Sequence, residues 1–221
     1  MIVPEGVELS TDVSVAGWIV DGLWPWDRQG IKVGSVVPEG FEAYARIEHA
    51  EKDVGNLPRR QLIALRTALE PWTITPDRCW YCVWSGYGVL AGDEMLRLMP
   101  GGRLRRWWAE RNMKRNARRT AEREGRLLSS IPQVRAEGRD YLLFVGPLSA
   151  AAFEFDISYQ SPNIPNIWWP DDRAWCVATE IDFSWTYVGA SRECIDRILS
   201  SGQLDSSEVS LEDPAVDPRF A

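Results

Sequence analysis

Two acidic residues in the last quarter of the chain, Glu180 and Asp182, are spaced as a carboxylate pair that can bind a metal ion or transfer a proton. We expect residues 173–183 to form a strand, which projects both carboxylates outward from one face about 7 Å apart, with Asp172 in the preceding turn. Paired carboxylates bind divalent cations or act as general acid and base. A metal-dependent hydrolase is therefore one interpretation. The simpler interpretation is that the two carboxylates lie on the solvent-exposed face of a sheet and have no catalytic role, because no nearby histidine, lysine or nucleophile completes a mechanism.

Cys79 and Cys82 have the spacing of half a zinc site or of a redox pair. A zinc site needs a second pair of ligands, and Cys176, Cys194 and His49 lack the required spacing. A redox pair needs a helix N-terminus to lower the thiol pKa, whereas the sequence around these cysteines indicates a strand. We expect buried structural thiols on opposite faces of that strand, with metal binding and redox chemistry as the alternatives.

His49 is the single histidine and could serve as an acid, a base or a phosphate contact. A surface or capping role is the simpler interpretation. The sequence contains no glycine-rich phosphate loop, nucleophile elbow or zinc-protease motif. It therefore indicates no metal site and no particular cofactor.

The segment 103–126 holds ten Lys or Arg residues and three Glu, so its net charge is +7 and that of the remaining chain is −14. Its composition predicts a helix about 30 Å long that leaves the main fold. Such a helix could bind nucleic acid or an anionic membrane, or it could be a solvated insertion on the protein's own acidic surface. The candidate nucleic-acid contacts are Arg105, Arg106, Trp107, Trp108, Arg111, Lys114, Arg115, Arg118 and Arg119.

Twelve tryptophans are far more than a chain of 221 residues usually contains. Most are expected in the core, but indole rings also line ligand pockets because they give rigid contact area and one donor each. The candidates for such a pocket are Trp168, Trp169, Trp175 and Arg173, joined by Trp24 and Trp26.

The predicted elements indicate an α+β fold with a mainly antiparallel sheet and two or three helices on one face, because strands cluster without regular alternation with helices. Residues 1–202 are expected to form a single domain, and the acidic tail 203–221 is expected to be disordered. The predicted strands are 12–20, 31–37, 79–84, 140–146, 151–158 and 173–183, and the predicted helices are 38–47, 58–70, 103–126 and 191–202.

The chain has a net charge of −7 and contains no apolar run of the 18 to 20 residues needed to span a bilayer. Its first residues carry acids where a signal peptide needs a basic start. Four cysteines are too few for a disulfide framework. These features predict a cytoplasmic protein.

The segments GSVVPEGFEAYARI (34–47), TPDRCWYCVWSGYG (75–88) and NIWWPDDRAWCVATEIDFSWTYVGASRECID (166–196) together resemble a family of actinobacterial proteins of unassigned function. That family typically has a WWP, a DRAWCVATEID and a YVGGS run, and here Ala190 replaces the second glycine of the last one. The resemblance implies a shared fold and no chemistry. Residues 33–47 are also similar, more weakly, to the SUKH superfamily of bacterial immunity proteins.

No complete catalytic constellation is visible in the sequence, so we expect a non-catalytic binding or protein-interaction module of the immunity or regulatory kind. Its partner would be a protein or a small molecule. A hydrolase using Glu180 and Asp182, and a nucleic-acid-binding protein using residues 103–126, are the alternatives.

Overall fold

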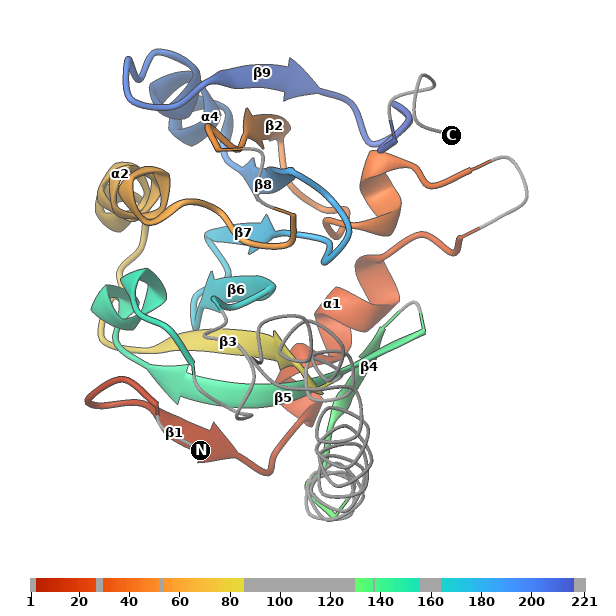
Figure 1. Cartoon of the computed structure of the whole chain (residues 1–221), viewed down its shortest axis with the longest axis vertical. Coiled ribbons are helices and arrows are strands. Elements are labelled where there is room, and N and C mark those ends of the chain that lie inside the picture. The colour runs from red at the N-terminus through yellow and green to blue at the C-terminus, as the bar shows by residue number, and fades with distance from the viewer. Residues whose placement is uncertain are drawn as a thin grey trace, which may run out of the picture.

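A nine-stranded sheet runs through the described part of the chain, and its paired strands are antiparallel (Figure 1). The computed structural model describes residues 3–26, 30–51, 54–85, 130–136, 138–155 and 164–216. The strand order is β1-β5-β3-β6-β7-β8-β2-β9, with β4 beside β5. The strands are β1 (Glu8–Ser10), β2 (Ala43–Glu48), β3 (Cys79–Trp84), β4 (Val134–Ala136), β5 (Arg139–Gly146), β6 (Ile167–Pro170), β7 (Trp175–Ala178), β8 (Trp185–Ala190) and β9 (Ser206–Val209).

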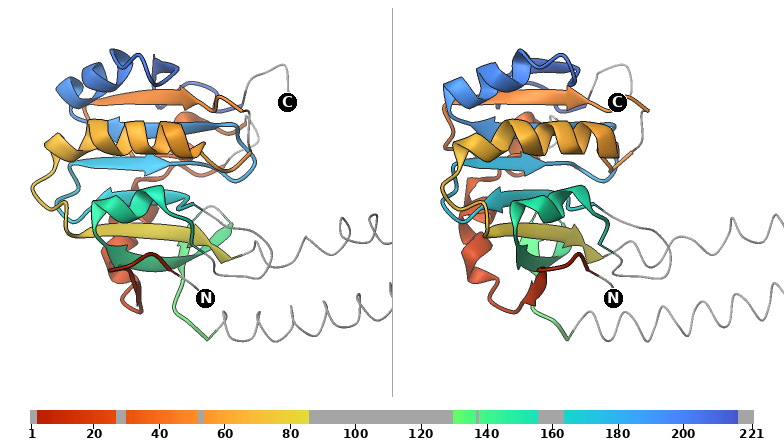
Figure 2. Two further views of the ribbon diagram at one scale, coloured as in Figure 1. Left: turned by 60° about the vertical axis from the view of Figure 1, so that its left-hand side comes forward. Right: turned by 90° about the vertical axis from the view of Figure 1, so that its left-hand side faces the viewer.

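Helical elements cover both faces of this sheet (Figure 2). The first face carries α2 (Arg59–Leu69), α4 (Arg192–Leu199) and the 3-10 helix η6 (Leu148–Ala152), and the second carries α1 (Gly17–Gly22) with the 3-10 helices η1 (Ser14–Ala16) and η2 (Val33–Ser35). The predicted α+β class with a mainly antiparallel sheet is confirmed. The two longer helices share one face, while the shortest, α1, lies on the other.

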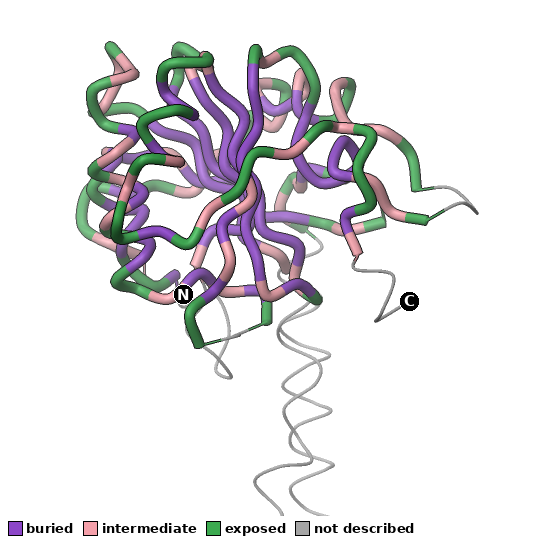
Figure 3. The backbone as a smooth tube through the Cα atoms, turned by 90° about the horizontal axis from the view of Figure 1, so that it is seen from above, coloured by how far each residue is buried: buried purple, intermediate pink, exposed green. Residues whose placement is uncertain are grey.

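The central strands are buried on both faces (Figure 3). In β7, Trp175 and Val177 belong to the core under α2 and α4, whereas Cys176 and Ala178 belong to the core under α1. Successive side chains of a strand point to opposite faces, so covering both faces requires an unbroken apolar run. Residues 175–178 therefore alternate between the two cores.

Helices α2 and α4 match the predicted segments 58–70 and 191–202. Leu62, Leu65 and Leu69 of α2 are buried against the sheet. The side chain of Ser191 accepts a hydrogen bond from the backbone N–H of Cys194, which satisfies one free donor of the first turn of α4.

The N-terminal layer was predicted as two strands, 12–20 and 31–37, and this prediction is wrong. Residues 14–22 are helical, because Asp12 Oδ1 accepts the N–H of Ser14 at 3.0 Å and opens the turn. Ala16 and Ile19 then lie one helical turn apart and are both buried against the sheet. Residues 33–35 form η2 and do not continue a strand.

The predicted helix at 38–47 is instead strand β2, which pairs with β8. The three-residue spacing of Phe41, Tyr44 and Ile47 suggested a helix, but both faces of β2 are buried. Tyr44 and Ile47 therefore belong to opposite cores. Gly189 of β8 makes this pairing possible, because a Cβ there would lie 2.5 Å from the ring of Phe41.

Two predicted strands are shorter than the sequence suggested. β7 ends at Ala178, and residues 179–184 turn the chain back into β8. Residues 148–152 form η6, residues 153 and 154 belong to no strand, and Phe155 makes a single bridge. Residues 156–158 of the predicted strand lie outside the described residues. The predicted strands 79–84 and 140–146 are confirmed as β3 and β5.

The acidic tail is ordered as far as residue 216, contrary to prediction. Strand β9 pairs with β2, and the buried side chains of Leu204 and Ala215 anchor the segment at both ends. The prediction was based on the acids, the prolines and the low apolar content of the tail, whereas an edge strand is held largely by backbone hydrogen bonds to its neighbour. Residues 217–221 lie outside the described part.

The predicted basic helix 103–126 and its candidate nucleic-acid contacts also lie outside the described residues. None of the helices within the described ranges has the length and apolar character to cross a bilayer.

Candidate functional site

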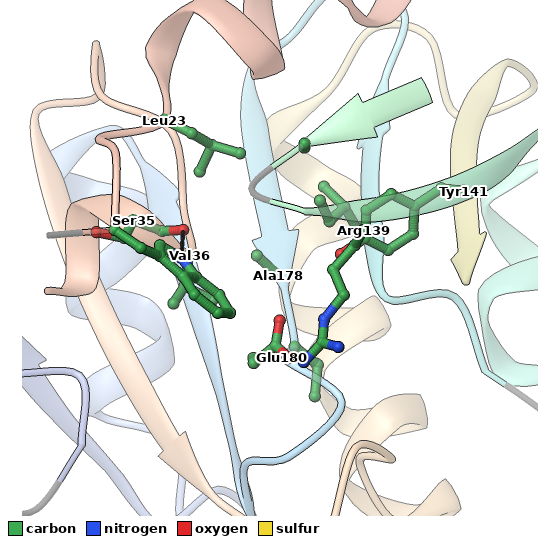
Figure 4. Close-up of a pocket in the computed structure, with 11 residues that line it drawn as sticks. Leu23, Ser35, Val36, Arg139, Tyr141, Ala178 and Glu180 are labelled. Atoms are coloured by element: carbon green, nitrogen blue, oxygen red, sulfur yellow. Dashed lines mark hydrogen bonds and ion pairs between the residues drawn. The ribbon is translucent and has the colours of Figure 1, made fainter. Parts of the chain in front are cut away.

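The predicted carboxylate pair lies in the β7–β8 turn, residues 179–184, where both side chains bind a single arginine. Arg139 Nη2 lies 2.7 Å from Glu180 Oε1 and 2.9 Å from Asp182 Oδ2. Figure 4 shows Arg139 reaching from β5 toward Glu180. A guanidinium already binds the pair for which metal binding was one interpretation.

The third predicted carboxylate, Asp172, lies at the opposite end of β7. It accepts hydrogen bonds from Thr73 Oγ1 at 2.8 Å and from the N–H of Ile74 at 2.7 Å, so it holds a loop. Within the described ranges, the His, Cys, Asp and Glu side chains form no group of three or more that could hold a metal ion. The predicted three-carboxylate hydrolase site is therefore not assembled there.

Glu180 was also predicted to face solvent, and this is wrong. Its side chain is only 7% exposed, whereas that of Asp182 is 72% exposed. The predicted strand stops at Ala178, so the turn folds Glu180 under the hairpin formed by β4 and β5. A buried carboxylate requires a partner, and Arg139 provides it from 41 residues earlier in the chain.

Burial is the main influence on the pKa of Glu180, which it raises above the ordinary value. The hydrogen bond and the positive charge of Arg139 act in the opposite direction, and Asp182 adds to the rise. For Arg139, burial lowers the pKa of the guanidinium, whereas the hydrogen bond to Glu180 and the negative charges of Glu180 and Asp182 raise it. The net result is a raised pKa. Arg139 therefore remains a cation.

Two indole rings flank the same guanidinium. The Cζ atom of Arg139 lies over the Trp84 ring at 5.4 Å from its centroid and over the Trp26 ring at 5.9 Å. Trp26 is 37% exposed, and its Nε1 donates to the carbonyl of Ser35 at 3.5 Å. We call Arg139, Glu180, Asp182, Trp26 and Trp84 the Arg139 cluster. The sequence pattern paired Glu180 with Asp182 and placed Trp26 in a separate candidate pocket, and it missed Arg139 and Trp84.

A narrow crevice leads from the Arg139 cluster along the second face of the sheet (Figure 4). The N-terminal layer forms one wall and the β4–β5 hairpin the other. The crevice holds about 20 Å³, which is room for roughly one water molecule. Its walls and floor include Leu23, Val36, Ala136, Tyr141, Ile167 and Ala178. It is too small for a metabolite, because ligand pockets usually reach about 300 Å³ or more.

A larger hollow of about 380 Å³ lies between the start of α2 and the end of η6. Phe153 and Ile164 form part of its wall. These residues flank the segment 156–163, which lies outside the described part, so the hollow does not define a site.

Of the five tryptophans predicted to line a pocket, Trp26 lines the crevice and Trp24 is half-buried, whereas Trp168, Trp169 and Trp175 fill the two cores. Trp168 and Trp175 pack edge to face at 5.2 Å in the first core, and Trp169 packs against Trp18 at 5.9 Å in the second. The side chains of Trp168, Trp169 and Trp175 are each at most 1% exposed. Arg173 lies outside the cores with its guanidinium over the Trp18 ring. Because successive strand residues face opposite ways, these three indoles cannot line one pocket.

The cysteines are buried free thiols, and Cys79 and Cys82 lie in different cores, as predicted. Burial raises the pKa of Cys79 to about 12 and that of Cys82 further still. A redox-active thiol needs the opposite shift.

A surface or capping role was expected for His49, but its side chain is buried, so the surface position is wrong. Its Nε2 lies 2.9 Å from Thr186 Oγ1, which in turn lies 2.7 Å from Thr179 Oγ1. These three side chains form a buried polar chain at the end of the sheet where the β7–β8 turn begins. Sequence reasoning missed both threonines, because nothing in their spacing pairs them with a histidine more than 100 residues away.

We expect Thr186→Val to lower the free energy of unfolding by about 1–3 kcal/mol, because valine has the same shape but removes a hydrogen-bonding partner from two buried groups. Urea titration measures the loss. Thr67→Val is the matched control, since Thr67 is exposed on α2, and should change stability by less than about 0.5 kcal/mol. Equal effects of the two substitutions would contradict a contribution from the buried chain.

Comparisons with protein-family models, with curated proteins and with solved structures give no match. The functional assignment therefore depends on the geometry of the site.

Proposed function

We propose that the protein is a non-catalytic protein-interaction module that binds a basic partner at the Arg139 cluster. The main observation behind this proposal is that the guanidinium of Arg139 contacts two carboxylates and two indole rings. Asp182 and Trp26, which belong to this cluster, are exposed. Carboxylates and indole faces both attract cations. The arrangement therefore suits recognition of a positively charged side chain.

The charge of the surrounding protein supports the same class of partner. The described residues include 22 acidic and 11 basic side chains, a net charge of −11. A field of one sign accelerates the approach of an oppositely charged partner and disfavours partners of like charge.

Apolar contact area is also exposed beside the β7–β8 turn that carries Glu180 and Asp182. Gly55 donates its N–H to the carbonyl of Phe183 at 2.8 Å, which places the neighbouring Val54 beside the β7–β8 turn. Val54 is 56% exposed. Exposed Trp and aliphatic groups around a polar centre are typical of protein interfaces, where tryptophan often contributes most of the binding energy.

A peptide display library selected on the full-length protein tests the proposal. We expect enriched peptides to be basic and to bind more weakly to two variants: Trp26→Ala by about tenfold or more, and Asp182→Asn by about threefold to fivefold. Asp196→Asn is the matched control, since Asp196 is a similarly exposed acid on α4. Enrichment of acidic peptides, or equal weakening by the Asp182 and Asp196 substitutions, would reject a site at the Arg139 cluster.

Nucleic-acid binding through residues 103–126 stays a prediction. If residues 103–126 bind nucleic acid, the affinity for DNA or RNA should fall steeply as the salt concentration rises and should disappear when residues 103–126 are deleted. Filter binding at several salt concentrations measures both effects. Binding that survives the deletion would contradict it, as would binding that salt does not weaken.

A further inference from the structure

We propose that the Arg139 cluster is a guanidinium site which the protein fills with its own Arg139 in the free state, and into which a partner inserts an arginine on binding. This inference rests on the proposed function and deepens it by naming the side chain that is recognised. In the complex, the partner's guanidinium takes the place of that of Arg139 between Trp26 and Trp84.

The shape of the site selects a guanidinium over an ammonium group. A guanidinium is planar, so its N–H groups can bind carboxylates at the edge while its faces contact aromatic rings. In the cluster, Glu180 and Asp182 bind such an edge, and Trp26 and Trp84 contact the guanidinium beside them. A compact ammonium group has no planar face to present to the rings and no paired N–H edge to present to a carboxylate.

Arg139 itself fits the site imperfectly. It reaches both carboxylates through the single atom Nη2, so neither pairing uses two parallel hydrogen bonds. Its Nε is buried and has no hydrogen-bond partner among the described residues. An arginine arriving from outside is free of the β5 backbone and can present two N–H groups to a carboxylate. The resident side chain is therefore a replaceable occupant.

The site is open on the side from which a partner would approach. Asp182 and Trp26 are both exposed, whereas Glu180 lies beneath them. Arg139 is the first residue of β5 and is 23% exposed, so its side chain has a route to solvent when another guanidinium enters. The negative charge of the described surface draws a cation to this opening.

Chemical rescue of Arg139→Ala tests the inference with a defined probe. Methylguanidine at about 10 mM should raise the midpoint of thermal unfolding of the variant, because a ligand that binds only the folded state stabilises it. Methylurea, which is planar but neutral, should not do so, and the wild-type protein should respond to neither. Adding Glu180→Gln to the variant should weaken the rescue. If Arg139→Ala does not fold alone, folding in methylguanidine but not in methylurea is the equivalent result.

The second measurement compares peptides that differ in one group. A basic peptide selected on the wild-type protein should bind Arg139→Ala at least about tenfold more tightly, since self-occupancy reduces apparent affinity by the fraction of open sites. Replacing its arginine with the neutral isostere citrulline should abolish the gain. No rescue by methylguanidine, or unchanged or weaker peptide binding, overturns the inference. If such peptides still bind the wild type through Trp26 and Asp182, the proposed function stands.

Discussion

Trp175→Ala should lower the free energy of unfolding by about 3–5 kcal/mol, the range for removing a large aromatic side chain from a packed core. Trp175 is fully buried on the first face of the sheet, where its ring packs edge to face against Trp168. Neighbouring strands fix the backbone of β7 on both sides, so the cavity can collapse only in part. Urea unfolding followed by far-ultraviolet circular dichroism measures the shift in midpoint.

Two substitutions distinguish this core role from a role in a binding pocket. Trp175→Phe should cost much less than alanine, because it keeps a ring and removes an indole N–H that has no partner in the described part of the chain. Trp26→Ala should change stability little, because that ring is partly exposed. A small effect of Trp175→Ala, similar to that of Trp26→Ala, would show that the ring does not support the core.

Arg139→Ala should destabilise the protein by about 3 kcal/mol at neutral pH, because it leaves Glu180 buried without its cation. This value is at the low end of the range for broken buried pairs, since Arg139 keeps some contact with solvent. The double variant Arg139→Ala with Glu180→Gln should recover part of the loss, because no carboxylate then remains buried.

The same variant should show a characteristic dependence on pH. The folded pKa of Glu180 is already raised above its usual value by burial. The folded state therefore binds a proton that the unfolded state releases, and stability falls as pH rises through the folded pKa. Loss of Arg139 removes its hydrogen bond and its positive charge, the two largest influences that hold this pKa down. The free energy of unfolding of Arg139→Ala should thus decline more steeply above about pH 4.5 than that of the wild type.

Urea titrations between about pH 4 and pH 8 measure this slope. Adding Glu180→Gln should restore the wild-type slope or a flatter one. A slope for Arg139→Ala that matches the wild type, or one of opposite sign, would contradict the assignment of Arg139 as the partner of a buried Glu180.

Local patterns were enough to predict several elements. Helices α2 and α4 have leucine or isoleucine at helical spacing, and Ser191 is placed to cap the second of them. Strands β3 and β5 are short apolar runs next to glycine or proline. In each case the residues that favour the helix or strand lie within about ten positions of one another, and packing in the tertiary structure favours the same conformation.

The errors arose where the environment of both faces had to be known. Strand β2 is buried on each side, so its apolar residues show no period of two and resemble a helix. Segment 12–20 alternates like a strand but is helical because the sheet beneath it accepts Ala16 and Ile19. Strand β9 has little apolar content and is held by backbone pairing to β2.

The candidate site shows the same division. The sequence alone determined that Glu180 and Asp182 lie near each other, because Cα atoms two positions apart in a chain are at most about 7 Å apart. It also determined that Cys79 and Cys82 lie on opposite faces of their strand, because the side-chain period of a strand is fixed. Only the tertiary structure decided that Glu180 is buried, that Arg139 binds both carboxylates, and that Asp172 lies elsewhere. The reason is that the sheet order β5-β3-β6-β7 does not follow the chain, so the start of β5 and the turn after β7 come to the same end of the sheet with two strands between them. The order in which strands pair is a property of the whole sheet.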